Sequence, residues 1–201
     1  NENVHYDKNK YTVKWGGAFE NQKRAYTRLS VIIPLTLVGM FILLYATFGK
    51  FRQAGLVLSI VPLALFGGML ALNVRGMTLN VSSAVGFIAM FGLSIQNGII
   101  MVSQINGLRI KGMELRKSVI EGALQRFRPI LMTSVTTILG LFPASLATGI
   151  GSDVQRPLAT VIVYGLMFST LVSMFLLPAF YYLVENNVLN KKKNDEKEYT
   201  L

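Results

Sequence analysis

The side chains best placed to do chemistry inside this chain form a short uncharged polar run within a long apolar segment. The run comprises Ser94, Gln96, Asn97, Ser103 and Gln104. Because a helix turns about 100° per residue, Ser94, Asn97 and Gln104 share one broad face, and Gln96 and Ser103 lie on another. Such groups either hydrogen-bond to neighbouring helices or line a route for protons or substrate. We keep both interpretations open for Ser94, Gln96, Asn97 and Gln104.

The sequence lacks the motifs of the common catalytic, phosphate-binding and metal-binding sites. The chain has no Cys, and its one His, His5, stands near the first residue. No glycine-rich loop with Lys could cradle a phosphate, no helical His pair could bind zinc, and no Ser, His and Asp are spaced as a catalytic set. The nine Met residues share no common spacing and are typical of apolar packing. The sequence therefore predicts no enzyme, no cofactor and no metal ligand.

The composition indicates a membrane protein. Of the 201 residues 52% are hydrophobic and 15% are charged, whereas about a quarter are charged in ordinary soluble domains. Five windows contain no Asp, Glu, Lys, Arg or His: 29–49, 53–74, 76–108, 129–152 and 157–184. Each is long enough for a transmembrane helix, which needs about 20 apolar residues. The predicted fold class is an all-α membrane protein with five transmembrane helices, and no acidic residue lies in the middle of a span.

The remaining segments complete the predicted organisation. Residues 11–17 alternate apolar and polar side chains and then reach paired glycines, which is typical of the last strand of a soluble domain. Apolar residues recur at helical spacing before Pro129, which indicates a basic amphipathic helix on the cytoplasmic membrane surface. The predicted boundaries are 1–28 for the domain end and connecting helix, 29–49, 53–74, 82–106, 129–149 and 157–184 for the transmembrane helices, 112–128 for the amphipathic helix and 186–201 for a disordered cytoplasmic tail.

The distribution of Lys and Arg predicts the orientation of the chain. The connections on one side of the predicted spans carry Lys50, Arg52, Arg109, Lys111, Arg116, Lys117, Arg126 and Arg128, and those on the other carry Arg75 and Arg156. Since cytoplasmic loops are richer in Lys and Arg, the C-terminal tail is predicted inside and the N-terminal tail outside. Six cations before the first span oppose this orientation unless upstream membrane segments deliver the tail outside. We therefore expect the chain to be the C-terminal portion of a larger protein.

Five motifs together resemble the C-terminal end of resistance-nodulation-division (RND) efflux pumps. They are Phe-Glu-Asn-Gln-Lys-Arg-Ala at 19–25, Pro-Leu-Ala-Leu-Phe-Gly-Gly at 62–68, Gly-Phe-Ile-Ala-Met-Phe-Gly-Leu-Ser-Ile-Gln-Asn-Gly at 86–98, Glu-Gly-Ala-Leu-Gln-Arg-Phe-Arg-Pro-Ile-Leu-Met-Thr at 121–133 and Gly-Ile-Gly-Ser-Asp-Val-Gln-Arg-Pro-Leu-Ala at 149–159. The last motif is more similar to the heavy-metal efflux branch than to the multidrug branch.

The resemblance implies an inner-membrane subunit with twelve spans, of which this chain would hold spans eight to twelve and the end of a periplasmic α+β domain. It implies a homotrimer that contains the N-terminal half of the same pump, joins a periplasmic adaptor protein and an outer-membrane channel, and exchanges protons for a metal cation such as zinc, cobalt or cadmium. No nucleic acid is an expected partner. The family's proton-relay carboxylates lie in the fourth span, and its periplasmic metal ligands also lie outside this stretch.

Two positions differ from some members of the family. Gln96 matches a site where some relatives carry Lys or Glu, and Ile130 matches a Lys in some copper and silver exporters. These differences disfavour copper or silver as cargo and imply that this part supplies polar, uncharged support to the relay. The alternatives are a multidrug or amphiphile exporter of the same superfamily and a stand-alone structural or regulatory membrane protein.

Overall fold

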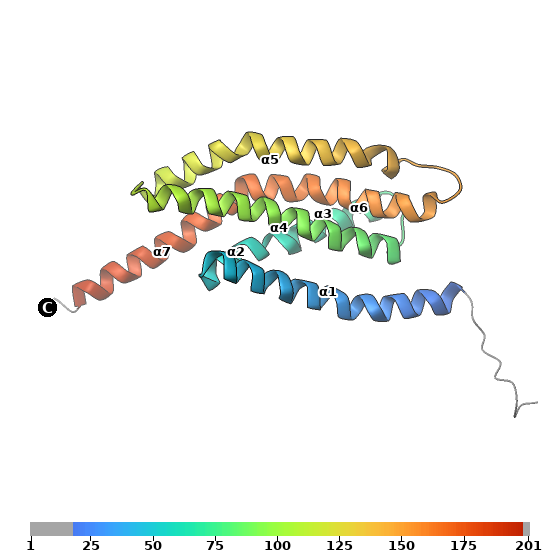
Figure 1. Ribbon diagram of the computed structural model, residues 1–201, viewed down its shortest axis with the longest axis horizontal. Helices are drawn as coiled ribbons and strands as arrows, with labels where there is room; N and C mark the ends of the chain where they lie inside the picture. Colours follow the sequence, from blue (N-terminus) through green and yellow to red (C-terminus); the bar gives the residue numbers. More distant parts are fainter. Residues whose placement is uncertain (1–17, 199–201) are drawn as a thin grey trace, which may run out of the picture.

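The computed structural model describes the backbone of residues 18–198 and the side-chain surroundings of residues 26–189, and this part of the chain is a helical bundle without strands (Figure 1). The elements are α1 (Ala18–Phe48), α2 (Phe51–Leu58), α3 (Ile60–Val74), α4 (Val81–Ile110), α5 (Leu115–Ser145), α6 (Ser152–Leu171), the π-helical η1 (Val172–Leu176) and α7 (Leu177–Glu198). The strand predicted at 11–17 lies outside the described residues.

Between residues 18 and 198, five helical stretches are long and apolar enough to cross a membrane, which confirms the predicted fold class. They are Tyr26–Phe48, Phe51–Val74, Val81–Ile110, Leu115–Ser145 and Ser152–Leu189. The second stretch contains a break between α2 and α3 at Ser59, whose hydroxyl donates to the carbonyl of Leu56 at 2.7 Å. The last stretch contains the π-helical η1 between α6 and α7. Each break lies within a single candidate span.

The segments predicted as an amphipathic helix over 112–128 and a transmembrane helix over 129–149 are one continuous helix, α5. Pro129 lies inside it, and the Thr133 hydroxyl donates to the carbonyls of Pro129 and Ile130 at 3.1 and 3.0 Å. The first half of α5 packs on α4, so closely that a Cβ on Gly122 would lie 2.8 Å from Ile105. The position of the first half at a membrane surface stays a prediction.

The end of the chain also differs from the sequence prediction. The tail expected to be disordered over 186–201 is helical as far as Glu198, because α7 continues without a break from its apolar first half. Residues 191–198 are mainly Lys and Glu, which are good helix formers in water. In Figure 1, α7 leaves the bundle and runs toward the C-terminus away from α4 and α5.

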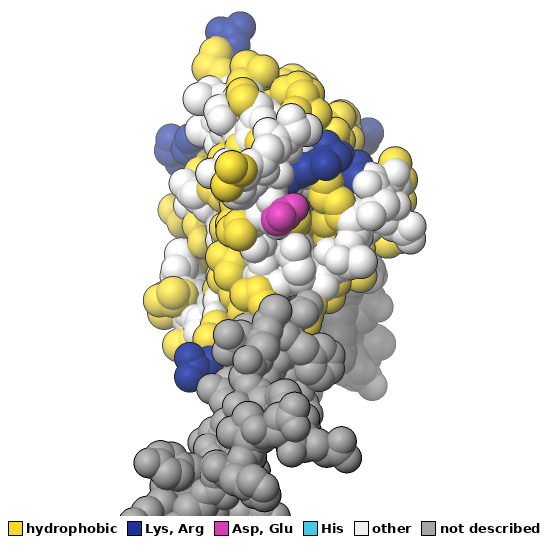
Figure 2. All heavy atoms as spheres, turned by 90° about the vertical axis from the view of Figure 1, so that its right-hand side faces the viewer, with side chains coloured by type: hydrophobic (Ala, Val, Ile, Leu, Met, Phe, Trp, Pro, Cys, Tyr) yellow, Lys and Arg dark blue, Asp and Glu magenta, His cyan; other side chains and the backbone are white. Residues whose placement is uncertain are grey.

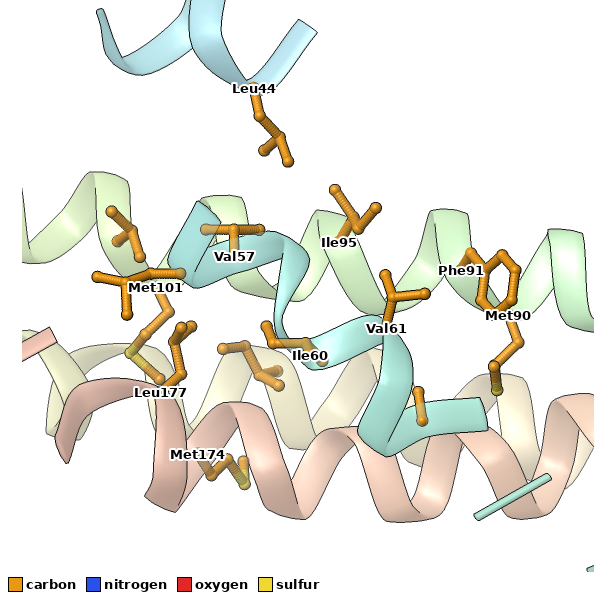
Figure 3. Close-up of a cluster of buried hydrophobic side chains, with 14 of the residues drawn as sticks. Leu44, Val57, Ile60, Val61, Met90, Phe91, Ile95, Met101, Met174 and Leu177 are labelled. Carbon is orange, nitrogen blue, oxygen red and sulfur yellow. The ribbon is translucent and has the colours of Figure 1, made fainter. Parts of the chain in front are cut away.

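The core of the bundle lies where α2 and α3 are enclosed by their neighbours. Figure 3 shows Val57, Ile60 and Val61 between α4 and the helix formed by η1 and α7, with Leu44 of α1 approaching from the other side. Each of these side chains is at most 2% exposed. By contrast α1 directs most of its apolar side chains outward, so it lies at the edge of the bundle.

Glycines set the close approach of α6 to its neighbours. A Cβ on Gly86 of α4 would lie 2.9 Å from the carbonyl oxygen of Leu158 on α6, and one on Gly67 of α3 would lie 2.5 Å from Cβ of Phe168. Small residues at such positions let the backbones of membrane helices pack closely. The helices α3, α4 and α5 therefore all pack on α6, and this arrangement positions the polar side chains between them.

We expect Gly86→Ala to lower the free energy of unfolding by about 1–3 kcal/mol, because the new methyl meets backbone that cannot move independently. Gly92→Ala is the matched control on the same helix, since a Cβ on Gly92 would meet no neighbouring atom within 4 Å. This change should be neutral or stabilising by up to about 1 kcal/mol. Unfolding by sodium dodecyl sulfate in mixed micelles, followed by circular dichroism, measures both. Equal stability of the two variants would contradict this account of the packing.

Candidate functional site

The structure separates the predicted polar residues of α4 into buried and exposed groups. Ser94 is 0% exposed and Asn97 is 7% exposed, so this face points into the bundle. Gln96 is exposed, and Ser103 is exposed as well. The two predicted faces of the helix therefore have different surroundings, and the two amides of Gln96 and Asn97 stand at the boundary between them.

Gln96 and Asn97 line a cavity of about 40 Å³ between α4 and α5. Across it stand the hydroxyl-bearing Thr133, Ser134 and Thr137 of α5. Among the described residues neither amide side chain has a hydrogen-bond partner. A polar space of this volume can hold a few water molecules, since one water needs about 10–15 Å³ on this measure.

A hydroxyl pair extends this cavity toward α6. The oxygen atoms of Ser134 and Thr170 lie 2.8 Å apart, and Thr170 Oγ1 is 2.7 Å from the carbonyl oxygen of Leu166. Both side chains are buried, at 3% and 4% exposed. Because a hydroxyl has one proton and two lone pairs, each can donate one bond while it accepts another. The two hydroxyls can therefore continue a chain of hydrogen bonds from α5 to α6.

One buried polar atom beside Asn97 has no partner. Ser94 Oγ is completely buried, and no hydrogen-bond partner lies near it among the described residues. An unpaired hydroxyl in an apolar interior is costly. The Ser94 hydroxyl is therefore available to a water or a polar group that reaches this face of α4.

The structure does not bring Gln104 together with the other predicted residues. Gln104 lies two turns further along α4, about 10 Å from Asn97 along the axis. Its side-chain oxygen accepts from Nε of Arg126 at 3.1 Å and from a terminal nitrogen of the same guanidinium at 2.7 Å. Its amide nitrogen donates to Gln125. Gln104 therefore joins α4 to α5 by hydrogen bonds and lies outside the cavity.

A second polar cluster lies at the end of the bundle where α4 ends and was not predicted from the sequence. We call it the α2–α4–α7 cluster; it comprises Gln53, Asn106, Arg109, Tyr181 and Glu185. Arg109 donates to Glu185 Oε2 at 2.9 Å, and Gln53 donates to Glu185 Oε1 at 3.3 Å. Gln53 and Asn106 exchange bonds of 3.1 and 2.8 Å, and the Tyr181 hydroxyl donates to Asn106 at 2.6 Å.

The members of the cluster are hydrogen-bonded to one another, and three of them are shielded from their surroundings. Gln53 and Tyr181 are 1% and 0% exposed, and Glu185 is 7% exposed. The sequence carried one usable signal, because Arg109 and Glu185 each stand directly after a charge-free window on the same predicted side. Their pairing across 76 residues could not be found from local spacing. The geometry of the cluster ties the ends of α2, α4 and α7 together.

The two polar sites differ in what they can do chemically. The cavity holds amides and hydroxyls that can exchange partners with water, but it has no ionisable group to store a proton. The α2–α4–α7 cluster holds charge, but its members are bonded to one another. The described residues contain no group of three His, Cys, Asp or Glu side chains that could hold a metal ion.

Comparisons with known proteins agree with this arrangement of helices. The profile of the AcrB/AcrD/AcrF family matches residues 6–185. Protein HelA of Legionella pneumophila is 46% identical over 188 residues, which cover 93% of this chain and 18% of HelA. The cobalt-zinc-cadmium resistance protein CzcA of Cupriavidus metallidurans is 45% identical over 173 residues, covering 86% of this chain and 16% of CzcA.

A solved structure is similar to this chain throughout the bundle. The crystal structure of a heavy metal efflux pump, crystal form II, superposes with a TM-score of 0.77 at 52% identity, and the match covers 92% of this chain and 18% of that one. The chain thus spans less than a fifth of the length of the proteins that it matches.

A double-mutant cycle tests the α2–α4–α7 cluster. We expect Arg109→Ala and Glu185→Gln each to destabilise the protein, because each leaves a partly or largely buried charge without its counter-ion, with a coupling energy of about 0.5–3 kcal/mol between the two sites. Arg116→Ala is the control, since Arg116 is exposed on α5 and forms no ion pair among the described residues. Unfolding in mixed micelles gives the energies. Additive effects of the two changes would contradict the pairing.

Proposed function

Because the chain belongs to the AcrB/AcrD/AcrF family, we propose that it forms part of a proton-driven exporter of heavy-metal cations such as cobalt, zinc and cadmium. The observation that carries the proposal is the 52% identity with a heavy metal efflux pump over 92% of this chain, with the same arrangement of helices. The similarity to a cobalt-zinc-cadmium resistance protein supports the same class of cargo.

Because the chain covers less than a fifth of the length of its relatives, the proposed pump needs further parts. The chain would work with the N-terminal half of the same pump in a homotrimer, together with a periplasmic adaptor protein and an outer-membrane channel. It would lie in the inner membrane of a Gram-negative cell, with its N-terminal tail in the periplasm and its C-terminal tail in the cytoplasm. The eight cations in the connections on the proposed inner side, against two on the other, support this orientation.

The cavity between α4 and α5 would supply the uncharged part of the proton route. Gln96 and Asn97 can orient water in the cavity, and Ser134 and Thr170 can continue the hydrogen-bonded path toward α6. The carboxylates that take up and release protons would come from another part of the pump, because no Asp or Glu lies in the middle of a predicted span of this chain. Gln104 would hold α4 and α5 together without a role in the route.

We expect Gln96→Ala and Asn97→Ala to lower zinc, cobalt and cadmium resistance at least several-fold while the amount of protein in the membrane stays constant. Each change removes an amide that faces the cavity, so water there loses a partner. Minimum inhibitory concentrations of the three metals measure the effect, and an immunoblot of the membranes measures the amount of protein.

Ser103→Ala is the matched control, because Ser103 is exposed on the same helix and outside the cavity. It should keep full resistance. Full resistance in both amide variants would remove Gln96 and Asn97 from the mechanism. Sensitivity to dyes and detergents, with unchanged metal resistance, would instead favour an exporter of drugs or amphiphiles.

A further inference from the structure

An apolar groove runs along the outside of the bundle between α3 and α6. Its volume is about 300 Å³, and its lining includes Phe66, Gly67, Leu70, Ala71, Phe168 and Leu171. Because Gly67 has no side chain, Phe168 packs against the backbone of α3 and forms the floor between the two helices. The groove extends from Phe66 to Arg75, about 13 Å along the axis of α3. That length is close to one leaflet of a bilayer, whose hydrocarbon core is about 30 Å thick.

A hydrogen bond to a buried hydroxyl group fixes Arg75 at one end of this groove. One terminal nitrogen of its guanidinium donates to Oγ1 of Thr160 at 2.8 Å, and Thr160 is 0% exposed. A guanidinium has five N–H donors, so four remain for another partner. Arg75 is half-buried, and its other guanidinium nitrogens have no partner among the described residues. The groove therefore has a fixed cation at its mouth.

A second cation stands on the same side of α6. Arg156 precedes Thr160 by one helical turn, so both residues lie on one face. Arg156 Nε is buried and has no hydrogen-bond partner among the described residues. It lines a pocket of about 280 Å³ together with Asn80, Ser152 and Asp153.

Asp153 is the acidic residue of this pocket, and it forms no ion pair with Arg156 within 4 Å in the described structure. Figure 2 looks onto this end of the bundle and shows dark-blue cationic side chains beside a magenta acidic one, with yellow and white atoms next to them. Two arginines and one carboxylate leave the site with a positive balance, which an anion would neutralise.

We propose that this groove binds an anionic phospholipid, with an acyl chain along α3 and α6 and the phosphate between Arg75 and Arg156. A phospholipid is the ligand that would fill the apolar groove and also pair with the two arginines. A free anion would leave the apolar groove empty, and an apolar protein helix would leave Arg156 Nε unpaired. Guanidinium groups bind phosphate through charge-assisted hydrogen bonds, and basic residues next to spans are typical of headgroup sites. The proposal does not depend on what the pump exports.

Photo-crosslinking in vesicles of equimolar phosphatidylglycerol and phosphatidylcholine tests the proposal. The subunit, expressed from its complete coding sequence, carries Phe66→p-benzoylphenylalanine, which places the reactive group in the groove at a position that is 58% exposed. After irradiation, mass spectrometry identifies the adducts. Phosphatidylglycerol adducts should exceed phosphatidylcholine adducts about tenfold, because both lipids carry a phosphate but the choline ammonium of phosphatidylcholine cancels its charge and is repelled by the two arginines.

The combined change Arg75→Gln and Arg156→Gln should remove this preference, and Arg75→Lys with Arg156→Lys should keep most of it. Arg28→Gln is the matched control, because Arg28 is exposed on α1 and does not line the groove, and it should change nothing. Size-exclusion chromatography confirms that each variant is folded. Adducts to protein alone, adducts in the ratio of the vesicle lipids, or a preference that survives the Gln changes would each overturn the proposal.

Discussion

Contact between helix backbones at glycines on and around α6 is the constraint on which the rest of this structure depends. Gly86 brings α4 against the carbonyl of Leu158, and Gly165 on α6 itself leaves room for the sulfur of Met90, which a Cβ there would meet at 2.1 Å. Inside a bilayer apolar side chains gain little by leaving lipid, so helices associate through close packing and hydrogen bonds. The same close packing places Ser134 next to Thr170 and forms the groove between α3 and α6.

The polar side chains divide into a group whose members hydrogen-bond to one another and a group with unused hydrogen-bonding capacity. The α2–α4–α7 cluster pairs its charges internally, as Arg109 does with Glu185, so that it ties helices together and has little to offer a ligand. The cavity beside Asn97 and the buried Ser94 hydroxyl have unused hydrogen-bonding capacity. Unsatisfied polar groups are costly in hydrocarbon, so those that remain are the places where water, protons or another part of the protein can be received.

The sequence predicted the features that depend on long windows and missed those that depend on pairs distant in the chain. Charge-free windows were enough to predict five spans, because the bilayer requires a minimum length. Helical geometry correctly placed Ser94 and Asn97 on one face of α4. The angular position of a residue around a helix does not show which neighbouring helix it contacts, so Gln104 was grouped with residues that it does not contact. Gln53 and Glu185 are 132 residues apart, and only the fold brings them together. The continuity of α5 through Pro129 could not be predicted from the sequence, because a proline can stand in the first turn of a helix as well as inside one.

The exposure of Gln96 limits where the missing charge of the proposed pump can approach. Asn97 is buried against α5 and α6, whereas Gln96, the next residue along α4, faces outward from the described bundle while still lining the same cavity. An element that carries carboxylates could reach the cavity from the Gln96 side without displacing α5. On the α5 side Thr133, Ser134 and Thr137 already occupy the wall. In the proposed function, the proton would pass from charged groups beside Gln96 to the uncharged hydroxyls between α5 and α6, and α4 would be the boundary between the two.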